Sequence, residues 1–107
     1  HIWMQGEADA AMSAEDYAGQ LRQLHGLLPP APWIITSNSV CTGRPERSAT
    51  LDRARIAFAA ATPGVHLGVD MDAIGPAFRQ ADRCHLNAAG QEAAARMAAD
   101  AVIRALR

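Results

Sequence analysis

Trp33-Ile34-Ile35-Thr36-Ser37 is the stretch that decides the fold. It is rich in β-branched and aromatic residues, prolines precede it, and Asn38 and Ser39 follow it, which is typical of a β-strand. Its apolar residues are consecutive rather than alternating with polar ones. We therefore expect a strand that is covered on both faces, as in a parallel sheet.

Two further strands and three helices are predicted on either side of this stretch. The strands are expected at 1–4 and 65–69, and the helices at 13–28, 48–61 and 87–106. The first strand is expected to be buried. Alternation of strands with helices implies parallel strands joined by right-handed crossovers, so the predicted fold class is α/β: a parallel sheet with flanking helices.

The composition excludes several classes of protein. The chain has 107 residues, of which 50% are hydrophobic and 20% charged, which allows one globular domain at most. Its basic residues are ten arginines and no lysine, scattered among eleven acids, so no nucleic-acid-binding patch is expected. No apolar run approaches the roughly 20 residues that cross a bilayer, so no membrane span is expected either.

Polar segments follow each predicted strand, at 5–9, 37–47 and 70–85. In parallel sheets, ligands bind beyond the carboxyl ends of the strands, so site residues are sought there. Asp82 and His85 have a spacing that lets the carboxylate bond the imidazole Nδ1 and leaves Nε2 as a base. The alternative for this pair is a surface salt bridge.

Gln5 and Gly6 end the first predicted strand. A side-chain amide held at that point can donate a hydrogen bond to a developing oxyanion. The alternative is that Gln5 only caps strand carbonyls and that Gly6 serves the turn.

Together these segments carry a family resemblance. The block Trp3-Met4-Gln5-Gly6-Glu7-Ala8-Asp9-Ala10 resembles the W-x-Q-G-E-x-D-A block of SGNH (GDSL-like) hydrolases, in the branch of sialate O-acetylesterases and other carbohydrate acetylesterases. Gly68–Asp72, then Arg79, then Asp82–Gln91 are similar to that branch's G-x-D-x-D, R and D-x-C-H-x-N-x-x-G-Q blocks. The resemblance spans nearly the whole chain and implies a flavodoxin-like fold.

The resemblance also implies a mechanism in which a serine attacks an acetyl ester of a carbohydrate, without metal or cofactor. It makes His85 the general base, Asp82 the acid that orients it, and Gln5 an oxyanion donor. Three residues are expected to support the loops: Gly6 and Glu7 behind Gln5, and Arg79, which would pair with Asp70 or Asp72.

The chain departs from the family pattern at the nucleophile, because it contains no Gly-Asp-Ser-like block. We therefore expect residues 1–107 to be the C-terminal portion of one SGNH-type domain, incomplete at its N-terminus, inactive alone and partnered by the missing N-terminal half. One alternative is that Ser37 or Ser39 approaches His85. Another is a noncatalytic, hydrolase-derived interaction module that pairs through its bare sheet edge.

Cys41 and Cys84 are the only cysteines, and their number alone allows free thiols and a disulfide equally. The resemblance implies a disulfide that ties the loop at 38–47 to the catalytic loop. Such a bond would indicate a secreted or periplasmic protein, while free thiols keep a cytoplasmic location open. The rival interpretation is a metal site formed by both cysteines with His66 and His85.

The remaining aromatic and histidine residues are expected to be structural. Trp3 and Trp33 are assigned to the core because each lies in a predicted strand. His66 is expected to be a hydrogen-bonded residue of a strand, and His25 a residue of a helix surface.

Overall fold

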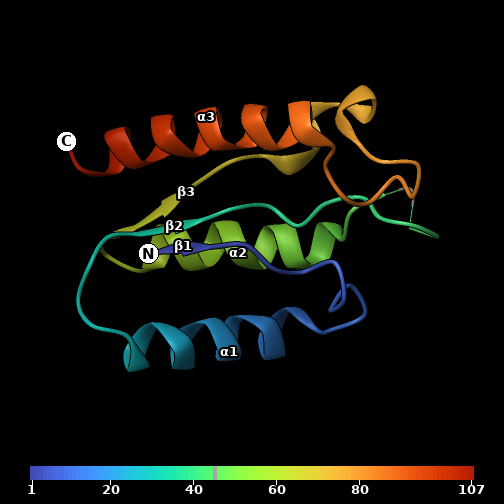
Figure 1. Cartoon of the computed structure of the whole chain (residues 1–107). Coiled ribbons are helices and arrows are strands. Elements are labelled where there is room, and N and C mark those ends of the chain that lie inside the picture. Colours follow the sequence, from blue (N-terminus) through green and yellow to red (C-terminus); the bar gives the residue numbers. More distant parts are fainter. Residues whose placement is uncertain (45) are drawn as a thin grey trace.

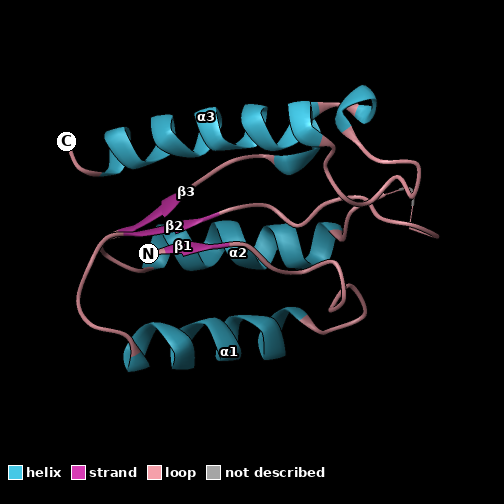
Figure 2. Cartoon of the chain, viewed as in Figure 1, coloured by secondary structure: helices cyan, strands magenta, loops and turns pink. Residues whose placement is uncertain are grey.

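The computed structural model describes residues 1–44 and 46–107, which form an α/β fold (Figures 1 and 2). Within these residues, three parallel strands form one sheet in the order β1-β2-β3, flanked by three α-helices and two short 3-10 helices. The elements are β1 Ile2–Trp3, α1 Ala14–Leu27, β2 Trp33–Ile35, α2 Ala49–Ala61, β3 Val65–Leu67, η1 Met71–Ile74, η2 Pro76–Phe78 and α3 Ala88–Ala105. The predicted α/β class is confirmed.

Side-chain caps set the first residue of each α-helix. Ser13 accepts a hydrogen bond from the Asp16 amide, Ser48 from the Leu51 amide, and Asn87 from the Gly90 amide. The helices therefore begin where the sequence predicts, whereas the paired parts of the strands are shorter than predicted. None of the helices in the described part of the chain is long and apolar enough to cross a membrane.

The central strand β2 is buried on both faces, as predicted. Trp33 and Ile35 face α1 and α2, where they belong to one hydrophobic cluster. Tyr17 and Leu21 contribute the buried stripe of α1, and the partly buried Leu24 and Leu28 extend it, as the helical spacing predicts. The other members of the cluster are Leu51, Ala54, Phe58 and Val65.

His25 is not a plain surface residue of α1, which corrects the prediction. Its ring lies edge-on to Trp33 with the ring centroids 5.2 Å apart, and it also meets Phe58 at 6.1 Å. His66 differs as well, because it is exposed on β3. Both predictions were wrong because the packing of the helices against the sheet, which a local sequence pattern does not show, decides which side chains are covered.

The helix α3 lies on the opposite side of the sheet from α1 (Figure 1). Its alanine-rich face packs on Val69, Met71 and Ile74 through a set of partly buried residues, namely Leu86, Ala93, Ala94, Met97 and Ala98. Near its end, Ala101 is buried and Val102 half-buried, while Ile103 is exposed. Val102 and not Ile103 therefore lies on the inner face of the helix.

The strand β1 is not buried, contrary to the prediction. It pairs only with β2, with Ile2 opposite Ile34 and Trp3 opposite Ile35, so it forms one edge of the sheet. Ile2 is 50% exposed and Met4 57% exposed. A run of apolar residues predicts a strand, but it does not reveal whether a neighbouring element covers that strand.

Gly90 allows α3 to approach the segment that precedes the Asp82–His85 turn. A Cβ atom at Gly90 would lie 2.2 Å from the Phe78 carbonyl oxygen. We expect Gly90→Ala to lower the free energy of unfolding by about 3 kcal/mol, because the clash is with backbone. Urea denaturation followed by circular dichroism measures this change.

Gly26→Ala is the matched control for that substitution. Gly26 is also helical, but a Cβ atom there would meet nothing within 4 Å. Alanine should therefore raise the free energy of unfolding by about 0.5 kcal/mol, through better helix propensity and a less flexible unfolded chain. Equal effects at the two glycines would contradict the role assigned to Gly90.

Candidate active site

Asp82 and His85 form a close pair in the turn between η2 and α3. The Asp82 Oδ2 atom lies 2.6 Å from His85 Nδ1, and Asp82 Oδ1 accepts the amides of Cys84 at 2.9 Å and His85 at 3.1 Å. Because an ionised carboxylate can only accept hydrogen bonds, Nδ1 carries the proton and Nε2 keeps a free lone pair. The His85 side chain is 74% exposed, so Nε2 is accessible.

The hydrogen bonds keep the Asp82 carboxylate ionised. They lower the pKa of Asp82 from 3.8 to about 2, with the bond from His85 as the largest cause and the Cys84 amide next. The carboxylate therefore holds the ring in one tautomer and can stabilise a positive charge on it. Local hydrogen bonds thus place the pair in the arrangement that the His–Asp part of a serine-hydrolase triad requires.

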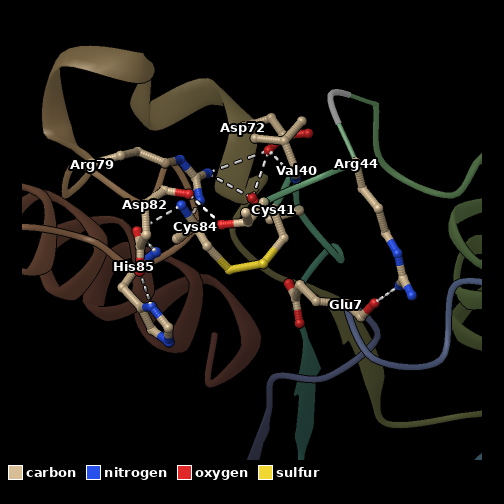
Figure 3. The surroundings of a disulfide bond; sticks show 11 residues. Glu7, Val40, Cys41, Arg44, Asp72, Arg79, Asp82, Cys84 and His85 are labelled. Atoms are coloured by element: carbon tan, nitrogen blue, oxygen red, sulfur yellow. Dashed lines mark hydrogen bonds and ion pairs between the residues drawn. A yellow bond between two sulfur atoms is a disulfide. The ribbon is translucent and has the colours of Figure 1, made fainter.

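Arg79 supports the turn through hydrogen bonds to the turn and to the neighbouring loops (Figure 3). Its guanidinium donates to the Cys84 carbonyl at 2.7 Å, to Ser39 Oγ at 2.6 Å, to the Met71 carbonyl at 3.0 Å and to Asp72 Oδ1 at 3.3 Å. Of the two partners predicted for Arg79, Asp72 is the one that it contacts.

Asp70 pairs with Arg47 instead of Arg79. Burial opposes the ionised form of Asp70, but the bonds from Arg47, the Asp72 amide and Ser37 together outweigh it and lower its pKa. The hydrogen bond to Asp70 raises the pKa of Arg47 in turn. Arg47 also lies 3.9 Å from Asp72, so Asp72 lies between the two arginines while Asp70 pairs with Arg47 alone.

Cys41 and Cys84 form a disulfide, with a sequence separation of 43. The bond joins the loop after β2 to the residue that precedes His85 (Figure 3). Thr42 strengthens the same junction, because its hydroxyl donates to the Asp82 carbonyl. The expected disulfide is therefore present, and it anchors the Asp82–His85 turn.

The disulfide overturns the alternative of a metal site. Both sulfur atoms are bonded to each other, so neither is a thiolate ligand, and His66 lies exposed on β3. Within residues 1–44 and 46–107, no group of three or more His, Cys, Asp or Glu side chains is placed to hold a metal ion.

Gln5, Gly6 and Glu7 lie at the carboxyl end of β1. Gly6 has φ +143°, and a Cβ atom there would lie 2.7 Å from Asn38 Cβ, so the turn requires glycine. The Glu7 carbonyl accepts a hydrogen bond from Arg44 (Figure 3). Gln5 lines a small hollow beside α1, and no hydrogen bond or shared cavity in the described part of the chain joins it to His85.

Ser37 and Ser39 do not approach His85 as nucleophiles, and that alternative is wrong. Ser37 is 1% exposed, and its hydroxyl accepts the Met71 amide at 2.8 Å. Ser39 is also buried, and it donates to Asp72 Oδ1 at 2.6 Å. Both hydroxyls hold the loop after β3 against the end of β2.

Comparison of the chain with models of protein families, with curated proteins and with solved structures finds no significant match. The function of the chain must therefore be inferred from its own sequence blocks and from the geometry of the Asp82–His85 turn.

Three residues that support this site were not predicted from the sequence: Thr42, Arg47 and Asn38. Thr42 was detectable, because it follows a cysteine that is tied to the Asp82 turn. Arg47 was not, because its partners Asp52 and Asp70 lie well apart from each other in the sequence. Asn38 is buried against Gly6, with its Oδ1 lacking a hydrogen-bond partner among the described residues.

The pKa of Asp82 provides a direct test of the pair. Because the folded pKa of about 2 lies below the unbonded value of 3.8, the pair stabilises the fold above about pH 4, and this stabilisation is lost as the pH falls through about 2. An NMR titration should place the Asp82 midpoint near 2. His85→Ala should shift it up toward 3.8, and His66→Ala, the exposed control, should not move it.

Proposed function

We propose that residues 1–107 are the C-terminal portion of a carbohydrate O-acetylesterase of the SGNH type, with a flavodoxin-like sheet. The observation that carries the proposal is the Asp82–His85 pair, with its short bond to Nδ1 and its exposed Nε2. Sequence blocks that resemble acetylesterases, in the family order, support it. The substrate class is an acetylated carbohydrate, and the chemistry requires no metal or cofactor.

In the proposed reaction, His85 Nε2 takes the proton of a serine hydroxyl while the serine oxygen bonds to the acetyl carbonyl carbon. Asp82 stabilises the imidazolium, and Gln5 donates to the oxyanion. His85 then returns the proton to the departing sugar oxygen as the ester bond breaks. Water, activated by the same histidine, releases acetate from the acetyl-serine.

The serine in this mechanism comes from a separate N-terminal segment of the same domain. All four serines of the chain have structural roles: Ser13 and Ser48 cap helices, and Ser37 and Ser39 are buried and hydrogen-bonded. A base and its orienting acid without a nucleophile predict that the isolated chain is inactive.

A secreted or periplasmic location is part of the proposal. Disulfides form and persist in oxidising compartments and are rare in the cytosol. The Cys41–Cys84 bond supports such a location for this reason, and it joins two loops of the proposed site.

A noncatalytic interaction module is the second candidate function, and the bare edge of β1 favours it. In the pairing with β2, the His1 and Trp3 carbonyls accept the amides of Ile34 and Thr36. The backbone groups of Ile2 and Met4 therefore point to the open edge, where their side chains are exposed too. An edge of this kind can pair with another strand.

Hydrolysis of p-nitrophenyl acetate separates the two functions. The purified chain should not exceed the rate of free imidazole, and the chain joined to a segment with a Gly-Asp-Ser block should turn over. Activity of the chain alone that is lost on His85→Ala and on Ser37→Ala or Ser39→Ala would contradict the proposal. The interaction module would be favoured if the joined protein folds, shows no esterase activity and self-associates through β1, which sedimentation measures.

A further inference from the structure

A cavity of about 790 Å³ lies between the loop after β2 and the turn that carries Asp82. Its volume is within the range of sites for small organic ligands. His85 does not line it, and the His85 ring points away from Asp72 and Arg79, which do (Figure 3). The cavity therefore adjoins the proposed esterase centre through Asp82 but does not include the His85 ring.

The polar groups of the cavity leave one positive charge in excess, because three arginines and two aspartates line it. Arg79 and Asp72 bond to each other, and Asp82 bonds to His85. The charges that remain are the positive ones of Arg83 and Arg44 and the negative one of Asp82, which the hydrogen bond from His85 does not cancel. The Arg44 guanidinium bonds only a backbone carbonyl, and the Arg83 guanidinium makes no hydrogen bond or ion pair within residues 1–44 and 46–107.

Arg83 also has an unusual backbone conformation. Its φ is +58°, and it is the only described residue other than glycine with a positive φ. This left-handed conformation costs an L-residue about 1 kcal/mol more than it costs glycine. Glycine would adopt this conformation more easily than arginine. Because strained residues cluster at functional sites, the presence of arginine here indicates that its side chain has a function.

We infer that this cavity binds a carboxylate carried on a single six-membered ring, through Arg83 and Arg44. A guanidinium matches a carboxylate with two parallel hydrogen bonds. The two aspartates disfavour a doubly charged anion such as phosphate. Small and apolar groups complete the lining and suit a ring: Val40, Pro76, Ala81 and the methyl of Thr42.

Two sources present this chemistry, an acidic sugar unit of a polysaccharide and a free organic acid. Glucuronate represents the first and cyclohexanecarboxylate the second, and glucose is the uncharged control. Each is titrated into the ¹⁵N-labelled chain while the amide shifts of residues 40–44 and 81–84 are followed. We expect binding of at least one carboxylate and at least tenfold weaker binding of glucose, and the tighter carboxylate identifies the source.

Variants locate the site. Arg83→Gln and Arg44→Gln, tested separately, should each weaken carboxylate binding about tenfold. Arg53→Gln removes the same charge from an exposed position on α2 and should leave it unchanged. No carboxylate binding, equal binding of glucose, or binding that neither cavity variant weakens would overturn the inference. The assay requires no serine, so its outcome does not depend on the esterase proposal.

Discussion

Under the proposed mechanism, replacing His85 with alanine is expected to lower kcat by about 10⁴- to 10⁶-fold, measured on the chain joined to the serine-bearing segment that the proposal requires. His85 is the only group in the mechanism that moves a proton, and its Nε2 is held in the basic tautomer by the 2.6 Å contact of Nδ1 with Asp82. Without it the serine hydroxyl has no base, and the sugar oxygen leaves without a proton.

Asp82→Asn should lower kcat by about 10³- to 10⁴-fold, because an amide can donate to Nδ1 and reverse the tautomer. KM for the acetylated substrate should change little in either variant, since neither side chain is proposed to bind the sugar. His66→Ala is the control and should leave kcat unchanged, because this histidine is exposed on β3. A loss below tenfold for His85→Ala in a folded protein would remove His85 from the mechanism.

Replacing Cys41 and Cys84 with serine is expected to lower the free energy of unfolding by about 4 kcal/mol. The disulfide closes a loop with a sequence separation of 43, and closing a loop of that length restricts the unfolded chain by about this amount. Small domains have roughly 5–15 kcal/mol in total, so the double variant should keep little stability.

Urea denaturation measures the change, and reductant provides its control. Dithiothreitol should lower the stability of the parent chain to that of the double variant and should not affect the variant itself. The Asp82 pKa should also rise in the variant, because Asp82 Oδ1 accepts the Cys84 amide in the turn that the disulfide anchors. A loss of stability below about 1 kcal/mol would show that Thr42 and Arg79 hold the turn without the bond.

Much of the fold was predictable because it depends on local patterns. Ser13, Ser48 and Asn87 marked the helix starts, since a capping side chain bonds an amide three residues later. The consecutive apolar residues Trp33, Ile34 and Ile35 predicted a strand that is covered on both faces. The edge position of β1 was not predictable, because it depends on which elements lie beside the strand.

The candidate site also has a part that local sequence predicts and a part that it does not. The Asp82–His85 pair spans three positions, so its spacing predicted a contact that the turn then makes. Its supports come from far away in the sequence: Ser39 and Thr42 lie 40 positions from the groups that they contact. No local pattern reveals contacts of that separation.

The sequence by itself therefore determined the α/β class, the helix starts and the Asp82–His85 pair, since these follow from residues that are close together in the sequence. Only the tertiary structure decided that Ser37 and Ser39 are buried supports, that Arg79 bonds Asp72 while Arg47 takes Asp70, and that β1 is an open edge. The roles of the serines and arginines depend on which polar groups lose water when the loops pack together, and the open edge of β1 depends on which elements lie beside that strand. A buried hydroxyl or guanidinium must then find a partner wherever the fold places one.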